Sequence, residues 1–381
     1  MRGRRDPQTQ LFYSINVEDR IRADHPLRPL KRRIDQILAL LSDKFAVAYS
    51  QTGRPSVPPE RILKALLLMA LYSVRSERQL CERIDTDLLF RWFLDMSPED
   101  EVFDPTVFTY NRPRLDEFGL TGAFFDAVVK QAKADGLCSD DHFSVDGTMI
   151  ESLASLKSFR RKDEKAEDAG DSNSFQSRNP DIDFHGEKRS NETHASRTDP
   201  EAKLYRKGPG KPSQLAYLGH ILNENRNGLI MEVCVTEAAG TAEKDAAIQM
   251  LDRYKEKHGG VPKTVGADAG YDSGPFLMDL EERQIEPHVA MTTTKPADPE
   301  TARGDRVDKI KARLRMQERQ QSSGYAISQR VRKKVEECFG WLKTIAGAGR
   351  SRWIGRSKLT QYFELSAAAY NLIRMTKLKP A

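Results

Sequence analysis

The chain has 381 residues, and 38% of them are hydrophobic, which is enough for two domains and a substantial buried core. Its longest apolar stretch, at 62–74, is too short to cross a bilayer and contains Lys64, so it predicts a buried helix rather than a membrane span. The N-terminus is basic but has no apolar run behind it, which argues against a secretory signal. We therefore expect a globular cytoplasmic protein.

The net charge of +5 is unevenly distributed along the chain. Residues 301–381 contain 19 Lys and Arg against 6 Asp and Glu, so this end has a net charge of +13 and the preceding 300 residues have −8. A clustered positive field attracts phosphate backbones through release of counterions. The asymmetry favours a nucleic-acid partner, although a solvated helical surface rich in Arg and Lys has the same composition.

Cysteine and histidine spacings show no metal or catalytic pattern. The four cysteines form no CxxC pair, and no histidine is spaced to complete a zinc site. We expect reduced, buried thiols and structural histidines.

Residues 26–136 have the pattern of helices. Pro59 suits a first helical position, and Ser76 with Gln79 has the spacing of a capping box that opens a second helix. Two helices joined by a tight turn are typical of a DNA-binding helix-turn-helix, but a plain helical bundle has the same signals. Both interpretations remain open at this point.

Two further helices are predicted before residue 137. Pro105 opens a short one, and Pro113 is expected to end it because proline interrupts helical hydrogen bonding. The other runs from Thr121 to a glycine stop at Gly136.

The hydrophobic period then changes from 3.6 to 2, with a strand at about 142–147 that ends at Asp146. Residues 157–201 are polar and charged, so we expect a largely irregular insertion there. Asn227-Gly228 between two apolar runs predicts a hairpin. The later elements expected in chain order are a helix from Thr241 to Gly259, a strand at about 263–268, a helix at 274–284, a short strand at 285–291, and helices to the end.

The order strand, strand, strand, helix, strand predicts a mixed α/β sheet of the RNase H-like type. We expect a helical, helix-turn-helix-like DNA-recognition domain over 1–137. It would be followed by an RNase H-like catalytic domain over 138–381 with a basic helical C-terminus.

Two aspartates follow strands of this expected sheet. Asp146 ends the first strand and Asp268 ends the strand after the crossover helix, so neighbouring strands would bring the two carboxylates together at one edge. Gly147 and Gly270 lie just behind them and would allow close approach of a bulky substrate. Each Asp-Gly pattern alone is more typical of a turn, and it is the repetition at two strand ends that indicates a site.

A third carboxylate is offered by the segment 330–343, which we expect to form one helix. Its apolar residues recur at intervals of 4, 3 and 4, and the adjoining face carries Arg332, Glu336 and Lys343. A simple surface salt bridge would explain these charges equally well if the helix stood alone. Together with the two aspartates, Glu336 is a candidate metal ligand.

Such a set of residues suits metal-dependent phosphoryl transfer on DNA. Mg²⁺ prefers hard oxygen ligands, and a pair of ions can activate the attacking hydroxyl and stabilise the leaving oxygen. We expect Mg²⁺ as the cofactor, with Mn²⁺ able to substitute.

Across nearly its whole length the chain resembles bacterial insertion-sequence transposases of the DDE class, in the insertion-sequence-five group. The resemblance rests on ordered blocks that include "SVDGTMIES", "ENRNGL", "ADAGYDS" and "RVRKKVEECFGWLK". It implies an RNase H-like fold whose acidic triad binds the catalytic metal, here Asp146, Asp268 and Glu336. It also implies that two or more copies pair the element's terminal inverted repeats and join them to target DNA, in a bacterial protein bound at the nucleoid.

Two details of this resemblance bear on the site. The family's tyrosine position holds Gln329 here, and Glu337 is a rival to Glu336 that a turn of 100° places on another helix face. The residues expected to contact DNA are Arg332, Lys343, Lys188, Arg189, Arg206, Lys207 and Arg330.

Two other functions fit the same residues. One is an RNase H-like nuclease with the same metals and no joining step. The other is a DNA-binding repressor with an idle site.

Overall fold

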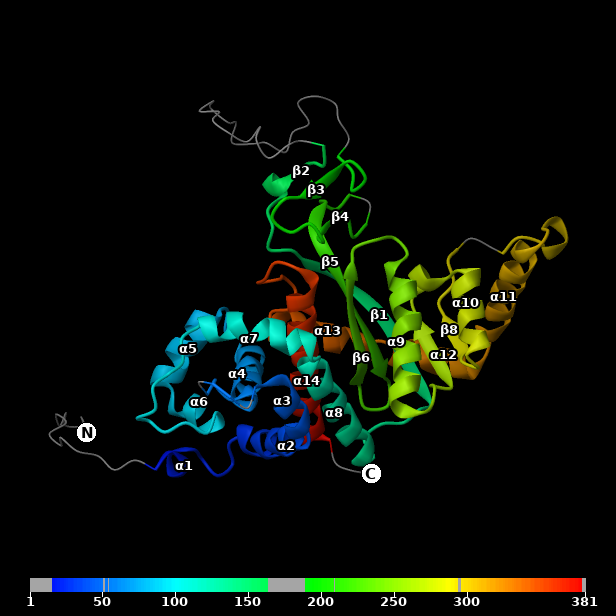
Figure 1. Cartoon of the computed structure of the whole chain (residues 1–381). Helices are drawn as coiled ribbons and strands as arrows, with labels where there is room; N and C mark the ends of the chain where they lie inside the picture. Colours follow the sequence, from blue (N-terminus) through cyan, green and yellow to red (C-terminus); the bar gives the residue numbers. More distant parts are fainter. Residues whose placement is uncertain are drawn as a thin grey trace, which may run out of the picture.

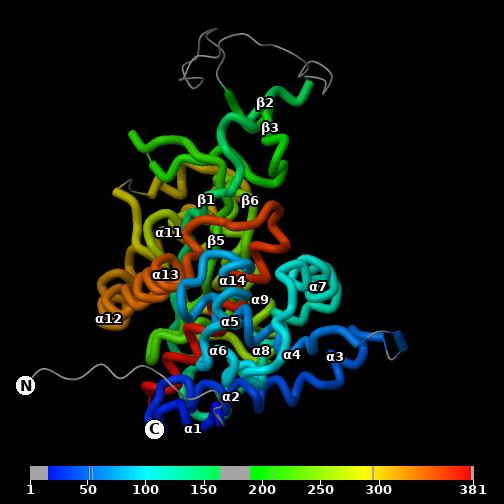
Figure 2. The backbone as a smooth tube through the Cα atoms, turned by 90° about the vertical axis from the view of Figure 1, so that its left-hand side faces the viewer, coloured from blue at the N-terminus to red at the C-terminus, as the bar shows by residue number. Residues whose placement is uncertain are grey.

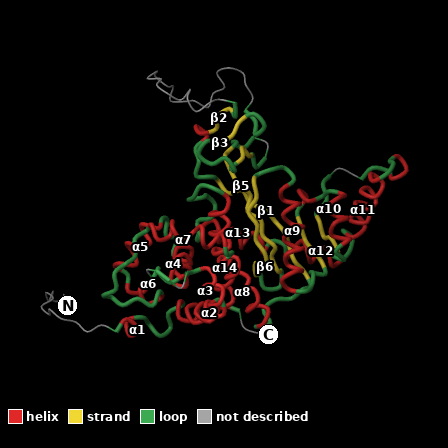
Figure 3. Tube along the Cα trace, in the orientation of Figure 1, coloured by secondary structure: helices red, strands yellow, loops and turns green. Residues whose placement is uncertain are grey.

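The computed structural model of the chain describes residues 16–50, 52–53, 55–163, 189–208, 210–293 and 296–378. A helical region formed by the first third of the chain lies beside a mixed sheet, and a long C-terminal helix runs between them (Figure 1). Figure 3 separates the two regions by secondary structure, with the strands gathered on one side and the N-terminal helices on the other.

The N-terminal helices begin and end largely where their capping residues predict. α4 starts at Pro59, and α5 follows Ser76, whose hydroxyl accepts a hydrogen bond from the Gln79 amide at 3.1 Å. The helices of this region are α1 (Val17–Arg20), α2 (Leu27–Leu40), α3 (Ser42–Ala48), α4 (Pro59–Leu71), α5 (Glu77–Thr86), α6 (Leu88–Phe93), α7 (Thr106–Glu117) and α8 (Leu120–Ala134).

The prediction that Pro113 ends a helix is wrong, because this proline lies inside α7. A proline in a helix loses one hydrogen bond and costs about 3 kcal/mol. Phe108 and Leu115 of the same helix are each only 1% exposed, and their burial offsets that cost. The predicted stop at Gly136 is confirmed by its left-handed φ of +70° just after α8.

The main sheet is mixed, as expected, and the RNase H-like α/β class is confirmed. Its central path runs β4-β5-β1-β7-β8, and β6 also pairs with β5. β1 is antiparallel to β5 and parallel to β7. The strands are β1 (His142–Glu151), β4 (Lys203–Tyr205), β5 (Gln214–Glu224), β6 (Leu229–Glu237), β7 (Thr264–Ala267) and β8 (Glu286–Val289).

The hairpin at Asn227-Gly228 joins β5 to β6, and Gly228 has the positive φ of +71° that such a turn requires. β1, however, is longer than predicted, because it stays paired with β5 as far as Glu151. Asp146 therefore lies in the middle of this strand instead of at its end.

The described part of the 157–201 insertion is more regular than predicted. β2 (Phe159–Arg161) and β3 (His194–Ser196) form a two-stranded sheet, in which the His194 ring stacks on the buried Phe159 at 5.4 Å. Phe159 belongs to the main hydrophobic core, so this aromatic pair anchors a polar segment to the rest of the molecule. The pair of strands lies at the end of the molecule away from α1 and α2 (Figure 2).

Helices cover both faces of the sheet. A β-carbon at Gly219 would stand 3.0 Å from the Phe363 ring of α14, whereas one at Gly147 would stand 3.0 Å from Glu243 of α9, on the other face. The helices after the hairpin are α9 (Ala242–His258), α10 (Gly274–Glu282), α11 (Asp305–Arg319), α12 (Ser323–Val331), α13 (Lys334–Thr344) and α14 (Arg356–Lys377).

α14 joins the two regions. It packs against α8, α4, α7 and α2 on one side and against β6 on the other. One continuous hydrophobic core includes residues of both regions. The division into two domains at residue 137 therefore stays a prediction. All four cysteines are free, and Cys81 and Cys338 are buried. No helix in the described part of the chain is long and apolar enough to span a membrane.

Candidate active site

Asp146 and Asp268 stand at the point where two parallel strands separate. The last paired residues of β1 and β7 are Ser144 and Gly266; Asp146 lies two positions further along β1, and Asp268 lies two positions after Gly266, directly beyond the end of β7. Because side chains alternate, both carboxylates lie on the sheet face that Ser144 and Gly266 share. Asp146 Oδ1 accepts a hydrogen bond from the Gly147 amide at 2.8 Å, and Asp268 Oδ1 accepts one from the Gly270 amide at 2.8 Å.

The electrostatics of Asp146 show that these carboxylates are close. The pKa of Asp146 is raised to about 6, mainly by burial and also by the negative charges of Asp268 and Glu243, whereas the Gly147 amide and Arg332 act in the opposite direction. A carboxylate whose proton affinity is raised by neighbouring negative charge is a place where a bound cation is stabilised.

The segment carrying Glu336 is two helices, not the single one that the sequence predicts. α12 ends at Val331 and α13 begins at Lys334. Between them the hydrogen bonds change to the tighter i to i+3 pattern, with the Val335 amide donating to the Arg332 carbonyl at 3.0 Å. Arg332 keeps helical dihedral angles, so the face that it shares with Glu336 is preserved.

α13 packs against β1, and its basic neighbours face the aspartates. The pKa of Lys343 is lowered by burial and by Lys207 and raised by Asp146, so Lys207 and Asp146 each lie near Lys343. Glu336 is exposed and lies on the helix between Arg332 and Lys343. Its role as a third ligand stays a prediction.

Glu337 is turned toward a different element. Its Oε2 lies 3.7 Å from Arg374 Nη1 on α14. This ion pair gives Glu337 a partner of its own, whereas Glu336 has no ion pair among the described residues.

Gln329 supports the strand that precedes Asp268's loop. Its Nε2 donates a hydrogen bond to the His288 carbonyl of β8 at 2.5 Å and lies 3.5 Å from the carbonyl of Ala267. The residue at the family's tyrosine position thus contacts backbone in this chain.

The predicted DNA-contacting residues do not all meet at one place. Arg332 and Lys343 lie near Asp146, and Lys207 lies near Lys343, as their electrostatic effects show. Arg189, Arg206 and Arg330 are exposed and have no electrostatic effect on Asp146, and Lys188 lies outside the described residues.

Sequence reasoning missed Glu243, in the first turn of α9. Burial raises the pKa of Glu243, and Asp268 raises it further. An acidic residue in a first helical turn is common because it complements the helix dipole, so the sequence has no signal that distinguishes this one.

The aspartates and Glu243 are neighbours, but the structure does not close them into a cage. Across the described residues, no three Asp, Glu, His or Cys side chains are arranged to hold one ion. The aspartates and the glutamates around them are nevertheless oxygen donors of the type that Mg²⁺ and Mn²⁺ take, so the donor chemistry fits such an ion.

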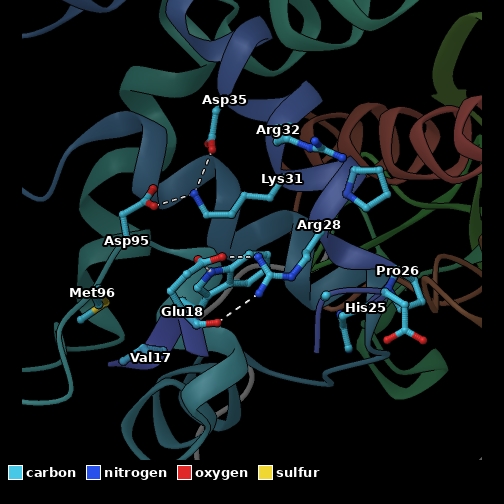
Figure 4. Close-up of a pocket in the computed structure, with 14 residues that line it drawn as sticks. Val17, Glu18, His25, Pro26, Arg28, Lys31, Arg32, Asp35, Asp95 and Met96 are labelled. Carbon is cyan, nitrogen blue, oxygen red and sulfur yellow. Dashed lines mark hydrogen bonds and ion pairs between the residues drawn. The ribbon is translucent and has the colours of Figure 1, made fainter. Parts of the chain in front are cut away.

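A large cavity elsewhere has a different character. A space of about 730 Å³ in the helical region is lined by residues of α1, α2 and the end of α6 (Figure 4). Several of its charged side chains are paired with one another, as with Lys31, which lies 2.8 Å from Asp35 and 2.5 Å from Asp95. None of the predicted site residues lines it.

Two family models match this chain. The model of the Transposase domain (DUF772) matches residues 15–114, in the helical region. The model of the Transposase DDE domain matches residues 181–372, half of the chain. The chain belongs to the DDE transposases. The DDE match includes Asp268 and Glu336 and begins after Asp146.

Solved structures of transposases are also similar to this one. A piggyBac transposase synaptic complex with hairpin DNA shares 10% identity over 92% of this chain and 75% of that chain, with a TM-score of 0.42. The Mos1 mariner paired-end complex with Mn shares 12% identity over 85% and 88% of the two chains, with a TM-score of 0.20. No curated protein matches this transposase.

As a DDE transposase, the chain acts on DNA, cleaving it and transferring strands. The resemblance stated from the sequence is confirmed at the level of this family.

Proposed function

We propose that this transposase cuts the ends of an insertion sequence of the insertion-sequence-five group and joins them to target DNA at one site formed by Asp146, Asp268 and Glu336. The observation that carries the proposal is the pair of aspartates beyond the last pairing of β1 and β7, where burial and mutual repulsion raise the pKa of Asp146 to about 6. A structural carboxylate would be paired with a cation, whereas these have no ion pair among the described residues.

Both reactions are in-line transfers at phosphorus. In the first, water attacks the phosphorus at the element end, the bond to the 3′ oxygen breaks, and that oxygen leaves with a proton as a 3′-hydroxyl. In the second, this hydroxyl attacks a target phosphorus, a new phosphodiester forms, and the target's own 3′ oxygen leaves. No side-chain nucleophile is needed in either step.

The chain's own residues hold and orient the reactants. Asp146, Asp268 and Glu336 would hold Mg²⁺, or Mn²⁺ in its place. When bound, the metal activates the attacking oxygen and stabilises the leaving one. Arg332 and Lys343 lie near Asp146, Lys207 lies near Lys343, and these cations would bind the scissile strand through its phosphates.

The experiment that tests this uses the full-length protein, Mg²⁺ or Mn²⁺, and labelled DNA bearing its own element's ends. Wild type should cleave and join, while D146N and D268N should lose both activities by about a thousand-fold or more and still bind the DNA. Strand transfer that survives in D146N would defeat the assignment. A pre-cleaved end isolates the joining step, and cleavage without joining would favour a nuclease.

We also propose that two or more copies pair the terminal inverted repeats of the element at the bacterial nucleoid. The motif resemblance is the support for this part of the proposal. Sedimentation of the protein with one and with two element ends would measure the number of copies, and a monomer that joins ends at wild-type rate would contradict it.

A further inference from the structure

Glu243 approaches the two aspartates from the other face of the sheet. Its Oε1 lies 3.0 Å from the point where a β-carbon of Gly147 would stand. Its Oε2 lies 3.9 Å, and Asp268 Oδ1 lies 3.0 Å, from the corresponding point at Gly270. The glutamate reaches this place because β7 ends at Ala267 and leaves that edge of β1 uncovered beyond Ser144.

A second observation points to a ligand at the same place. His220 pairs with Gly147 across β1 and β5 and is fully buried. Its Nε2 is bonded to Thr236 Oγ1 at 2.8 Å, but its Nδ1 has no hydrogen-bond partner among the described residues. That nitrogen lies 3.0 Å from the Gly147 β-carbon position, the same point that Glu243 Oε1 approaches.

A buried nitrogen without a hydrogen bond is unfavourable, so a partner supplied at this place would stabilise it. The space in front of Nδ1 is open because residue 147 is glycine, and any side chain there would fill it. A carboxylate oxygen, or a water bound to it, is the group within reach.

A helix-dipole role does not account for this arrangement. Asp245 lies in the same first turn of α9, is exposed, and would stabilise the helix terminus equally well. Glu243 instead is half-buried against Gly147 and next to Asp268.

We propose that Glu243 is a fourth carboxylate of the divalent-cation site, and that His220 positions it through Nδ1. This inference rests on the proposed function, because it adds a ligand to the same site. In this arrangement the ligands reach one cation from two sides: Asp146 and Asp268 from one face of the sheet, and Glu243 from the other.

The test measures binding of Mn²⁺ alone to the full-length protein without DNA, by calorimetry and by the paramagnetic resonance of free Mn²⁺. E243Q should weaken Mn²⁺ binding by at least about ten-fold, and the matched control D245N should leave it unchanged. Thermal unfolding of each variant checks that the fold is intact. Wild-type affinity in E243Q would overturn this inference alone, whereas wild type that binds no Mn²⁺ would overturn the proposed metal site itself.

If E243Q does not fold, a second pair of variants tests the same contact between His220 and Glu243. H220Q keeps a polar atom near Thr236 and removes Nδ1, so it should weaken Mn²⁺ binding several-fold. H220N places its amide near the Nδ1 position and should retain wild-type affinity. Equal affinities in the two variants would show that His220 does not position Glu243.

Discussion

The helical region and the edge of the sheet each gather carboxylates, and they differ in what neutralises them. In the helical region, Lys64 is 3% exposed and lies 2.6 Å from Asp35 and 2.5 Å from Asp95. At the sheet edge, Asp146 and Asp268 have no ion pair with any described Lys or Arg, and burial and the charges of its acidic neighbours raise the pKa of Asp146.

The difference separates a structural cluster from a reactive one. A buried lysine must keep its partners because an uncompensated charge in the core is costly. A cation that arrives from solvent can be held only where the protein has left negative charge unneutralised. The helical cluster therefore serves stability, and the sheet-edge cluster is available for a cation and the DNA phosphates.

The strongest test of this comparison uses variants of the adjacent residues Glu336 and Glu337. E336Q should reduce cleavage and joining by about a hundred-fold or more, because it removes an unpaired carboxylate beside the site. E337Q should retain activity, since Glu337 is paired with Arg374 on α14. Initial rates on a labelled element end measure both. A reversed ranking would make Glu337 the ligand.

The helical cluster should show the opposite profile. The double variant D35N/D95N leaves Lys64 buried without a carboxylate and should lower the free energy of unfolding by about 3 kcal/mol. Chemical denaturation measures this change. D146N, as the control, should not lose stability, because it relieves repulsion. Equal destabilisation by both variants would remove the distinction between the clusters.

Glu364 is a third kind of carboxyl, buried between α14 and α8, with its Oε2 accepting a hydrogen bond from Thr121 at 2.6 Å. Burial raises the pKa of Glu364 from 4.5 to about 7. Between these values the folded chain holds a proton that the unfolded chain releases, so this group's contribution to stability falls as pH rises from 4.5 to 7.

E364Q removes that dependence and keeps an acceptor for Thr121. Its stability should match wild type at pH 4.5 and exceed it by about 1 to 3 kcal/mol at pH 8. Denaturation at both pH values measures the difference. A constant offset between the two proteins would show that Glu364 does not titrate in this range.

The smallest expected effect is on DNA binding and comes from Lys207, which lies near Lys343. K207A should weaken DNA binding a few-fold, equally for all sequences, and reduce the slope of log affinity against log salt by about 1. K263A is the control, because Lys263 lies at the other end of β7 and pairs with Asp141 at 2.6 Å. A change of sequence preference in K207A would contradict a phosphate contact.

Much of the fold was predictable because its signals are local. Helix starts at Pro59 and Ser76, the Gly228 turn and the Gly136 stop each depend on residues within a few positions of one another. The predictions that were wrong needed tertiary information. Pro113 is tolerated because its helix is packed, and β1 extends past Asp146 because β5 pairs with it.

The candidate site divides in the same way. Asp146 and Asp268 were identifiable because each follows an apolar strand segment, and the parallel register of β1 and β7 places them side by side. Glu243 was not, because its neighbours lie on other strands and its local sequence is that of an ordinary helix start.

By itself, the sequence determined the element order, the two aspartates and the family resemblance, since period, caps and motifs are properties of neighbouring residues. Only the tertiary structure decided that α14 packs the helical region onto the sheet, so that α2 to α8 share one hydrophobic core with the sheet. It also decided that Glu243 and His220 meet at Gly147. These three residues lie on segments that are far apart in the chain, and only the folded structure sets the distances between them.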